Sequence, residues 1–418
     1  MSDCRLKIFV SAYACEPGLG SEIGVGWHWV LEMSKHFELW VLTRESNRGT
    51  IEPWIAEHPE FNGIHFLYFD LPKWARFWKK GMRGVRIYYN IWQMCTNRIV
   101  KRTMQENNIR IYHLLTYGNA LWPVSSYGKR QFFIWGPTSV GTYTPADFTK
   151  YYSFFSRQKE VLQRFMKKTL FMNFGFRNRC KHANIILCKT DVTIKCIPLK
   201  YRQKCIQFTD VAVNAGSIKQ QSTKNAKEDN TIRFFTAGTL VGWRNFDVLI
   251  EAFRIVKDTV KNTELTIVGG GKEKERLKKL SQKLDLNNCI NFTGQLKMEN
   301  YLQELNKADV VVNPCFREGS VTVSFDSMSY KKPLICFDSG GYTHYFNEAY
   351  SIVLKDIQKR DVAIQKLADA MIKLSDKGVA QEMGRLSNEA GKLYSWKNKG
   401  LEIYKIIQMK YQEYNNGK

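Results

Sequence analysis

Residues 308–341 read ADVVVNPCFREGSVTVSFDSMSYKKPLICFDSGG, and this stretch decides the fold. Two short apolar runs, Val310–Asn313 and Leu334–Phe337, enclose a segment with helical spacing from about Val321 to Tyr330. The order strand, helix, strand predicts a parallel β-α-β unit. Ligands of parallel sheets bind where the strands end and the helices begin.

Two acidic residues and a pair of glycines lie at the strand ends of this unit. Glu318 lies in the loop before the helix, Asp326 lies on the helix, and Gly340 and Gly341 follow the second strand. Bare backbone N–H groups of glycines suit an anion or a sugar hydroxyl. A carboxylate at each end suits a ligand with hydroxyls at both ends, which describes a nucleotide-sugar. The alternative is that both acids are simply solvated surface groups.

Length and composition narrow the class of protein. With 418 residues the chain predicts two domains, and its 44% hydrophobic content excludes a disordered chain. The ten cysteines are scattered without a close C-x2-C pair, which is typical of a cytosolic protein with free thiols. We expect neither a signal peptide nor a membrane-spanning helix, because no apolar run is long enough. The 63 Lys and Arg against 39 acids, a net charge of +24, favour nucleic acid, an anionic membrane or diphosphate substrates.

The first half of the chain opens with a strand over Leu6–Ala12, followed by the glycine-rich run CEPGLGSEIGVGWHW at residues 15–29. Strand, glycine loop and helix in this order point backbone N–H groups at a phosphate. The run is not a complete dinucleotide fingerprint, because Ile23 stands where the third glycine belongs. The alternative is a tight turn with glycines that let the helix pack closely.

Two blocks, residues 71–105 and 150–182, mix aromatic and basic side chains and hold one acid, Glu160. Rings and cations are both stable in the headgroup layer of a membrane. The blocks therefore predict contact with an anionic membrane surface. Two alternatives stay open: nucleic-acid binding, because rings stack on bases, and ordinary amphipathic helices with a solvated basic face.

A polar run, KQQSTKNAKEDN at residues 219–230, predicts a linker. A new strand, loop and helix follow in residues 231–253, with Phe246, Leu249, Ile250 and Phe253 at helical spacing. The predicted division of the chain is residues 1–218 as the N-terminal domain, 219–230 as linker, 231–396 as the C-terminal domain and 397–418 as a final helix.

Several of these motifs together resemble family 4 glycosyltransferases, which are retaining enzymes of the GT-B class. The spacing of Glu318 and Asp326 is similar to the family's E-x7-E signature, and residues 20–27 are similar to the GSE-x-G-x-GW opening of one branch. The resemblance implies an α/β GT-B fold with two Rossmann-like domains facing a central cleft. It also implies that the C-terminal helix crosses back to the N-terminal domain.

The resemblance also implies roles for individual residues. Glu318 is expected to contact the donor sugar, Arg244 to grip the leaving diphosphate in place of the usual Lys, and His113 to lie near the reacting sugar. The alternative for His113 is a structural histidine at a strand end. The implied donor-binding residues are Gly20, Ser21, Thr239, Gly294, Leu296, Ser320, Val321, Thr322, Asp326, Gly340 and Gly341.

The predicted function is transfer of a sugar from a nucleotide-diphosphate-sugar to a lipid-linked surface-glycan acceptor, with retention. No Asp-x-Asp pair occurs in the sequence, so we expect neither a metal nor a further cofactor. The predicted location is the inner face of the cytoplasmic membrane, without nucleic acid as a partner. Two other classes remain open: a nicotinamide oxidoreductase, because glycine loops follow strands, and a non-catalytic GT-B scaffold that binds glycan or nucleic acid.

Overall fold

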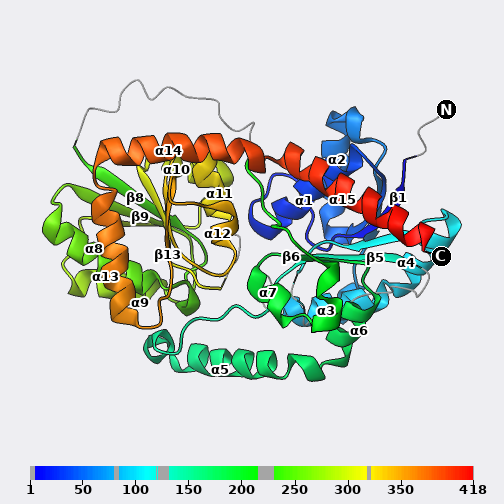
Figure 1. Cartoon of the computed structure of the whole chain (residues 1–418), viewed down its shortest axis with the longest axis horizontal. Helices are drawn as coiled ribbons and strands as arrows, with labels where there is room; N and C mark the ends of the chain where they lie inside the picture. The colour runs from blue at the N-terminus through cyan, green and yellow to red at the C-terminus, as the bar shows by residue number, and fades with distance from the viewer. Residues whose placement is uncertain are drawn as a thin grey trace. The chain divides into compact units, whose positions relative to one another are not determined.

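The computed structural model describes residues 5–79, 84–118, 120, 131–214, 230–317 and 322–417. The chain forms two compact units (Figure 1). The first consists of Met1–Gly141, Lys168–Asp210 and Trp396–Lys418, and the second of Thr142–Lys167 and Val211–Ser395. None of the helices in these described ranges is long and apolar enough to cross a bilayer. The predicted linker lies outside them, except for Asn230.

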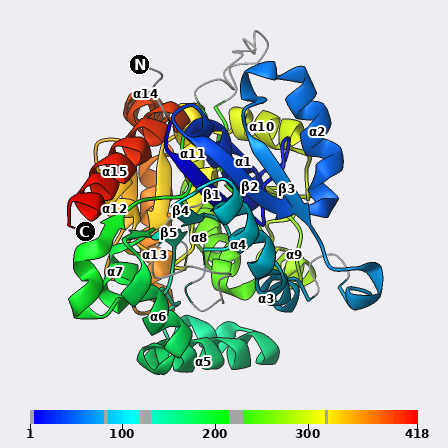
Figure 2. The same ribbon diagram turned by 90° about the vertical axis from the view of Figure 1, so that its right-hand side faces the viewer.

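The first unit is built on a parallel sheet with the strand order β3-β2-β1-β4-β5-β6-β7. Its strands are β1 (Lys7–Ser11), β2 (Glu38–Arg44), β3 (His65–Phe69), β4 (Ile111–Leu114), β5 (Phe132–Thr138), β6 (Ile185–Cys188) and β7 (Cys205–Gln207). β1, β2 and β3 lie side by side (Figure 2). Runs such as Ile8–Val10 are buried, as expected for strands covered on both faces. The strand order reverses between β1 and β4, and in such sheets this switch point marks the usual ligand position.

The helices of the first unit are α1 (Ser21–Ser34), α2 (Arg48–Glu57), α3 (Val85–Cys95), α4 (Asn97–Glu106), α6 (Phe174–His182), α7 (Asp191–Cys196) and α15 (Trp396–Asn416). The C-terminal helix α15 packs on α1, with Ile403 and Ile407 buried. Lys399 on α15 is buried too, and its Nζ donates to Thr209 O at 2.7 Å. This placement confirms the prediction that the last helix returns to the N-terminal unit.

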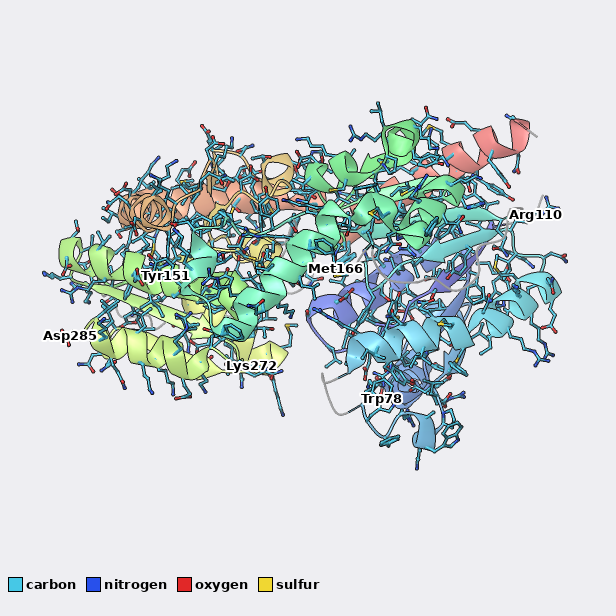
Figure 3. The ribbon with its side chains drawn as sticks, turned by 90° about the horizontal axis from the view of Figure 1, so that it is seen from below. Trp78, Arg110, Tyr151, Met166, Lys272 and Asp285 are labelled. Atoms are coloured by element: carbon cyan, nitrogen blue, oxygen red, sulfur yellow. The ribbon has the colours of Figure 1, made fainter. Side chains whose placement is uncertain are left out.

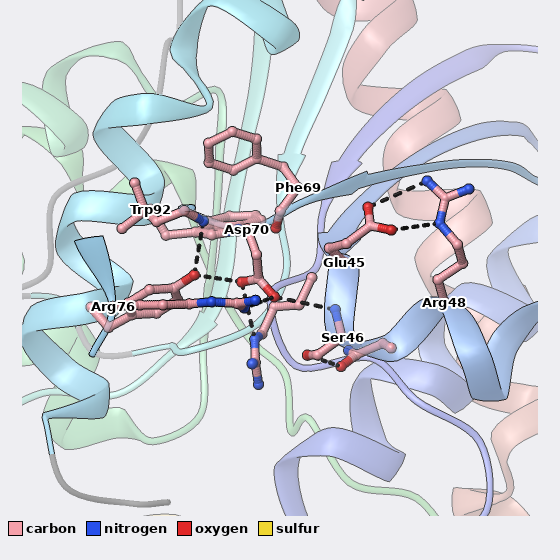
Figure 4. A network of polar contacts seen from close by, with 11 residues as sticks. Glu45, Ser46, Arg48, Phe69, Asp70, Arg76 and Trp92 are labelled. Atoms are coloured by element: carbon pink, nitrogen blue, oxygen red, sulfur yellow. Dashed lines mark hydrogen bonds and ion pairs between the residues drawn. The ribbon is translucent and has the colours of Figure 1, made fainter. Parts of the chain in front are cut away.

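A polar network around Asp70 ties α3 to the end of β3 (Figure 4). Asp70 Oδ1 accepts a hydrogen bond from the Tyr88 hydroxyl at 2.6 Å, and Oδ2 accepts from Arg76 Nη1 at 3.2 Å. Trp92 Nε1 donates to Phe69 O at 2.7 Å. Tyr88 and Trp92 are buried, so these two aromatic side chains of the block 71–105 belong to the core and are unavailable to a membrane.

The second unit is built on a parallel sheet with the order β10-β9-β8-β11-β12-β13. Its strands are β8 (Ile232–Ala237), β9 (Thr263–Val268), β10 (Ile290–Gly294), β11 (Val310–Asn313), β12 (Leu334–Phe337) and β13 (Ser351–Leu354). Its helices are α8 (Phe246–Thr259), α9 (Lys274–Lys283), α10 (Met298–Lys307), α11 (Thr322–Ser329), α12 (Tyr342–Tyr345), α13 (Arg360–Lys373) and α14 (Lys377–Gly391). The predicted apolar side of α8 is buried in the core, which confirms its helical period.

Residues 142–167, which include nearly all of α5 (Phe154–Lys168), pack with the second unit. Phe148 lies in the core of that unit, 5.0 Å from Phe316 between ring centroids. The Tyr152 hydroxyl bonds Asn245 Oδ1 at 3.2 Å. The division read from the sequence puts these residues in the N-terminal half. They join the other unit because Phe148 and Tyr152 are buried in it and because Glu160 on α5 pairs with Arg317.

Candidate functional site

The carboxyl edge of the second sheet gathers most of the predicted donor-binding residues. Here the loop after β8 packs backbone to backbone on the loop after β9. Leu240 N donates to Gly270 O at 3.0 Å, and a Cβ atom on Gly269 would lie 2.0 Å from Gly238 O. Only glycine fits at Gly269, which has a φ of +138°. The glycines of this loop therefore set the shape of the edge.

Arg244 lies at this edge, in the short 3-10 helix Gly242–Arg244. Its guanidinium packs on Gly238, where a Cβ atom would lie 2.9 Å from Arg244 Nη1. Arg244 Cζ is 5.0 Å from the ring centroid of Trp243, and Arg317 Cζ is 5.1 Å from the same centroid. The contacts bring two guanidinium groups to one indole ring at the ends of β8 and β11, and the charge of Arg317 is compensated by its ion pair with Glu160.

Asn245 holds the two loops in this arrangement. It has a left-handed φ of 56° just before α8, and its Nδ2 donates to Pro314 O at 2.9 Å. Asn is one of the few residues that adopt this conformation readily. The hydrogen bond connects the loop that carries Arg244 with the loop that leads to Glu318. Glu318 itself, with Ser320 and Val321, lies outside the described residues.

Arg317, the last described residue before Glu318, is anchored by several contacts. Its Nη1 is 3.0 Å from Glu160 Oε2, its Nη2 donates to Gln163 Oε1, and its carbonyl accepts from Thr142 Oγ1 at 2.7 Å. Arg317 and Trp243 were not among the residues predicted from the sequence. Their positions in the sequence could have identified them. Arg317 directly precedes the predicted acid Glu318, and Trp243 directly precedes the predicted cation Arg244.

Asp326 is buried on α11, with 6% of its surface exposed. The Tyr301 hydroxyl donates to Asp326 Oδ2 at 2.8 Å. Burial raises the pKa of the Asp326 carboxyl to about 7, although the hydrogen bond from Tyr301 acts in the opposite direction. Near neutral pH the carboxyl is therefore divided between its charged and neutral forms. The predicted ribose contact has to be made by a group that already has a tyrosine partner.

Asn313 joins the other elements at this edge. Its Nδ2 donates to the Tyr342 hydroxyl at 2.6 Å and lies 3.4 Å from Ser324 Oγ, so the end of β11 is bound to both α12 and α11. Gly340 has a φ of +80°, and its N–H donates to Asp338 Oδ1 at 2.8 Å. The expectation of a bare N–H at Gly340 is therefore wrong, because the side chain two residues earlier occupies it.

The remaining predicted residues of this unit lie at the ends of β8 and β10 and at the start of α11. Thr239 is exposed, while Gly294, Leu296 and Thr322 are half-buried. Gly294 O accepts from Gly269 N at 2.9 Å. A Cβ atom on Gly294 would lie 3.8 Å from Lys274 Nζ, so this edge holds a further cation, which was not among the predicted residues. Gly341 directly precedes α12.

His113 lies inside the sheet of the first unit. It is in the middle part of β4 with no exposed surface, and its Nε2 donates to Gly136 O at 2.7 Å. Burial lowers the pKa of His113 to about 4, so the ring is neutral at physiological pH. A catalytic contact with a sugar does not fit this placement, because the ring has no exposed surface and packs beside Trp29 of α1, 6.0 Å away between ring centroids. The placement of His113 agrees with the alternative, a structural histidine.

Gly20 and Ser21 lie at the start of α1, where Ser21 has a φ of 58°. The next residue, Glu22, is held by the loop after β4, because its Oε1 accepts from Tyr117 N at 2.7 Å. Gly26 is a packing glycine, since a Cβ atom there would lie 2.0 Å from a backbone carbonyl oxygen. The motif thus contains a glycine needed for packing, and the donor-binding role of Gly20 and Ser21 stays a prediction.

Comparisons with known proteins agree with this geometry. Residues 217–392 match the family model of the glycosyl transferases group 1. The solved structure of WaaG, a glycosyltransferase involved in lipopolysaccharide biosynthesis, is similar to this chain with a TM-score of 0.60 and 13% identity. The similarity covers 96% of this chain and 99% of that one. The fold is GT-B.

A second solved structure and a curated protein are also similar to this chain. Anabaena HepE, solved in complex with UDP-glucose, has a TM-score of 0.59 and 12% identity over 97% of this chain and 100% of that one. An uncharacterized glycosyltransferase of Methanocaldococcus jannaschii is 25% identical over 221 residues. That match covers 52% of this chain and 54% of the archaeal protein, so the chain spans about half of this relative's length. Within the described part of the GT-B chain, no group of three His, Cys, Asp or Glu side chains is placed to hold a metal ion.

Proposed function

We propose that this protein transfers a hexose from a nucleotide-diphosphate-sugar to a lipid-linked surface-glycan acceptor at the cytoplasmic membrane. We further propose that it belongs to the retaining family 4 and acts without a divalent metal. The position of Arg244 carries the proposal, because Arg244 and Arg317 meet at Trp243 beside the glycine loops. The family match of residues 217–392 supports transfer, and the HepE complex with UDP-glucose supports the donor class.

The named residues suggest how the reaction proceeds. In this proposal Arg244 binds the diphosphate and stabilises the charge that develops on it as the bond from C1 to the phosphate oxygen breaks. Lys274, beside Gly294, adds positive charge at the same edge. The acceptor hydroxyl forms the new bond to C1 on the same face, and its proton passes to the departing phosphate. Glu318 contacts the sugar, and Asp326 contacts the ribose.

The acceptor side of the proposal has different support. WaaG, named for its involvement in lipopolysaccharide biosynthesis, has the same fold. The net charge of +24 suits anionic lipid headgroups and diphosphates. From these features we propose a peripheral position on the inner face of the cytoplasmic membrane.

Arg244→Ala tests the central claim, with Arg385→Ala as the matched control. Arg385 is an exposed arginine on α14 that forms ion pairs with Glu382 and Glu389. Donor hydrolysis and transfer are measured with UDP-, GDP-, ADP- and dTDP-linked sugars. We expect the Arg244 variant to lose about a hundredfold or more in rate, as when one charge-stabilising group is removed from a polar active site, and the control to keep its rate. Equal rates in both variants would contradict the role of Arg244.

The finer claims have separate tests. Nuclear magnetic resonance of the product gives its anomeric configuration, and an inverted configuration would contradict the proposed membership of the retaining family 4. Transfer activity that disappears with a chelator and returns with magnesium would contradict the proposal that the enzyme acts without a divalent metal. Absence of hydrolysis with every donor, together with binding of glycan, would favour the non-catalytic scaffold.

A further inference from the structure

Helix α5 exposes its apolar side and covers its polar side. Val161 and Leu162 are each 57% exposed and Phe165 is 62% exposed, and with Phe154 they follow helical spacing along one side. Met166, labelled in Figure 3, lies near the end of the same helix. A helix in a water-soluble protein ordinarily turns its apolar stripe toward the core. This helix does the reverse.

The covered side of α5 is bound to its own unit by polar contacts. Glu160 is 3% exposed and pairs with Arg317 at 3.0 Å. Arg164 Nη2 donates to Thr144 O at 2.6 Å, and Lys167 Nζ lies 4.0 Å from the ring centroid of Tyr143. These contacts fix the rotation of the helix about its axis. The exposure of the apolar side is therefore a consequence of specific polar bonds on the opposite side.

The apolar exposure continues along the chain beyond α5. Phe171 and Met172, in the 3-10 helix Leu170–Met172, are 65% and 62% exposed, and Phe174 is 84% exposed. Residues 150–182 hold nine Lys and Arg against one acid. That one acid, Glu160, is buried against Arg317, so the exposed charge of this stretch is positive. The exposed basic residues of α5 and its continuation are Arg157, Lys159, Lys168, Arg177 and Lys181.

We infer that the exposed side of α5 inserts into an anionic lipid surface. Rings and aliphatic groups flanked by cations are the composition of helices that lie in the headgroup layer. A second copy of this chain would bring the same positive charge to the contact, whereas anionic lipid neutralises it. Nucleic acid would attract the cations and could stack on Phe165, but it would leave the aliphatic side chains of Val161 and Leu162 exposed to water, whereas lipid buries rings and aliphatic groups alike. The inference rests on the proposed function for one point, the position of the protein at a membrane, and it adds which surface of the protein contacts the lipid.

The test is cosedimentation of the full-length protein with vesicles of phosphatidylcholine, with and without phosphatidylglycerol. The apolar variant is Val161→Ser with Leu162→Ser. The matched control is Leu199→Ser with Met409→Ser, because those two side chains are 78% and 51% exposed elsewhere. We expect binding to anionic vesicles to weaken about a hundredfold in the apolar variant, since each of the two apolar side chains buried in lipid contributes about a tenfold factor. The control should bind like the wild type.

A charge variant, Arg157→Gln with Lys168→Gln, provides a second measurement. Each exposed cation near an anionic surface contributes about a fivefold factor, so binding should weaken by about twenty-five-fold and lose part of its salt dependence. Equal binding of wild type and both variants would overturn the inference. Two other results would also overturn the inference. One is a dimer in sedimentation velocity that the apolar variant abolishes, in a protein that does not bind vesicles. The other is binding to single-stranded RNA without binding to vesicles.

Donor hydrolysis without vesicles separates this inference from the proposed function. The apolar variant should hydrolyse nucleotide-sugar at the wild-type rate, because Val161 and Leu162 lie on the side of α5 opposite its protein contacts. Vesicle binding in a protein that hydrolyses no donor would contradict only the proposed function. Hydrolysis by a protein that binds no vesicles would contradict the lipid surface and the peripheral membrane position, and would leave the proposed sugar transfer standing.

Discussion

Replacing Asp326 with asparagine should stabilise the protein in a way that grows with pH. Asp326 is buried, and its pKa is raised from 3.8 to about 7 chiefly by that burial. The folded chain thus holds the proton more tightly than the unfolded chain. The contribution of this carboxyl to the free energy of unfolding is fully present below about pH 4, falls as the pH rises toward 7, and is lost above that.

The magnitude follows from the size of the rise. Each tenfold change in proton affinity is worth about 1.4 kcal/mol, so an increase from 3.8 to about 7 corresponds to roughly 4 kcal/mol of lost stability at pH 8. An asparagine side chain at this position has the same shape, cannot ionise, and keeps a carbonyl oxygen that can accept the hydrogen bond from Tyr301. Asp326→Asn should therefore match the wild type at pH 4 and exceed it by up to about 4 kcal/mol at pH 8.

Urea denaturation of both full-length proteins between pH 4 and pH 8 measures this difference. Other titrating groups are common to both chains, so they cancel in the comparison. A stability difference that stays constant with pH, or that shrinks as the pH rises, would refute the argument. Donor KM measured in the same series tests function separately, since loss of a charged acceptor for the ribose hydroxyls should raise KM at pH 8.

Three further outcomes concern stability. Tyr301→Phe removes the hydrogen-bond donor to Asp326. We expect the free energy of unfolding, measured by urea denaturation, to fall by about 1–3 kcal/mol at pH 8. The loss should be smaller at pH 5, because a protonated carboxyl depends less on the donor. Gly269→Ala places a methyl group within 2.0 Å of a backbone carbonyl oxygen, so it should lose about 2 kcal/mol or more, whereas the neighbouring control Gly270→Ala meets nothing within 4 Å; equal thermal shifts would contradict this. Burial lowers the pKa of Lys399 from 10.5 to about 7. The free energy of unfolding of the wild type should therefore rise by about 3 to 4 kcal/mol relative to that of Lys399→Met as the pH increases from 7 to 10. A difference that does not change with pH would contradict the lowered pKa.

The local patterns of the sequence predicted most of the secondary structure of the second unit. Val310–Asn313 and Leu334–Phe337 are strands with the predicted bounds, and α11 lies between them. This succeeds because a buried parallel strand needs a continuous apolar run, and because α8 must repeat apolar residues at the helical period to reach the core. The parallel sheet then places the loops after β8 and β11 at one edge, which is why Arg244 and the chain leading to Glu318 lie near each other.

Tertiary structure decided which side chains are available. From their residue types, His113 was predicted to lie near the reacting sugar and Trp92 to belong to a block that contacts a membrane, but packing buries both of them. Their types were visible in the sequence, whereas their burial depends on strands and helices that come from elsewhere in the chain.

The sequence by itself determined the strands, the helices and the glycine loops, because these depend on residues a few positions apart. Only the tertiary structure paired Asp326 with Tyr301 and Arg317 with Glu160, the latter 157 residues away. Those pairs set the protonation of one site residue and turn the apolar side of α5 outward. Spacing along a chain carries no information about such partners, since their meeting depends on how whole elements pack.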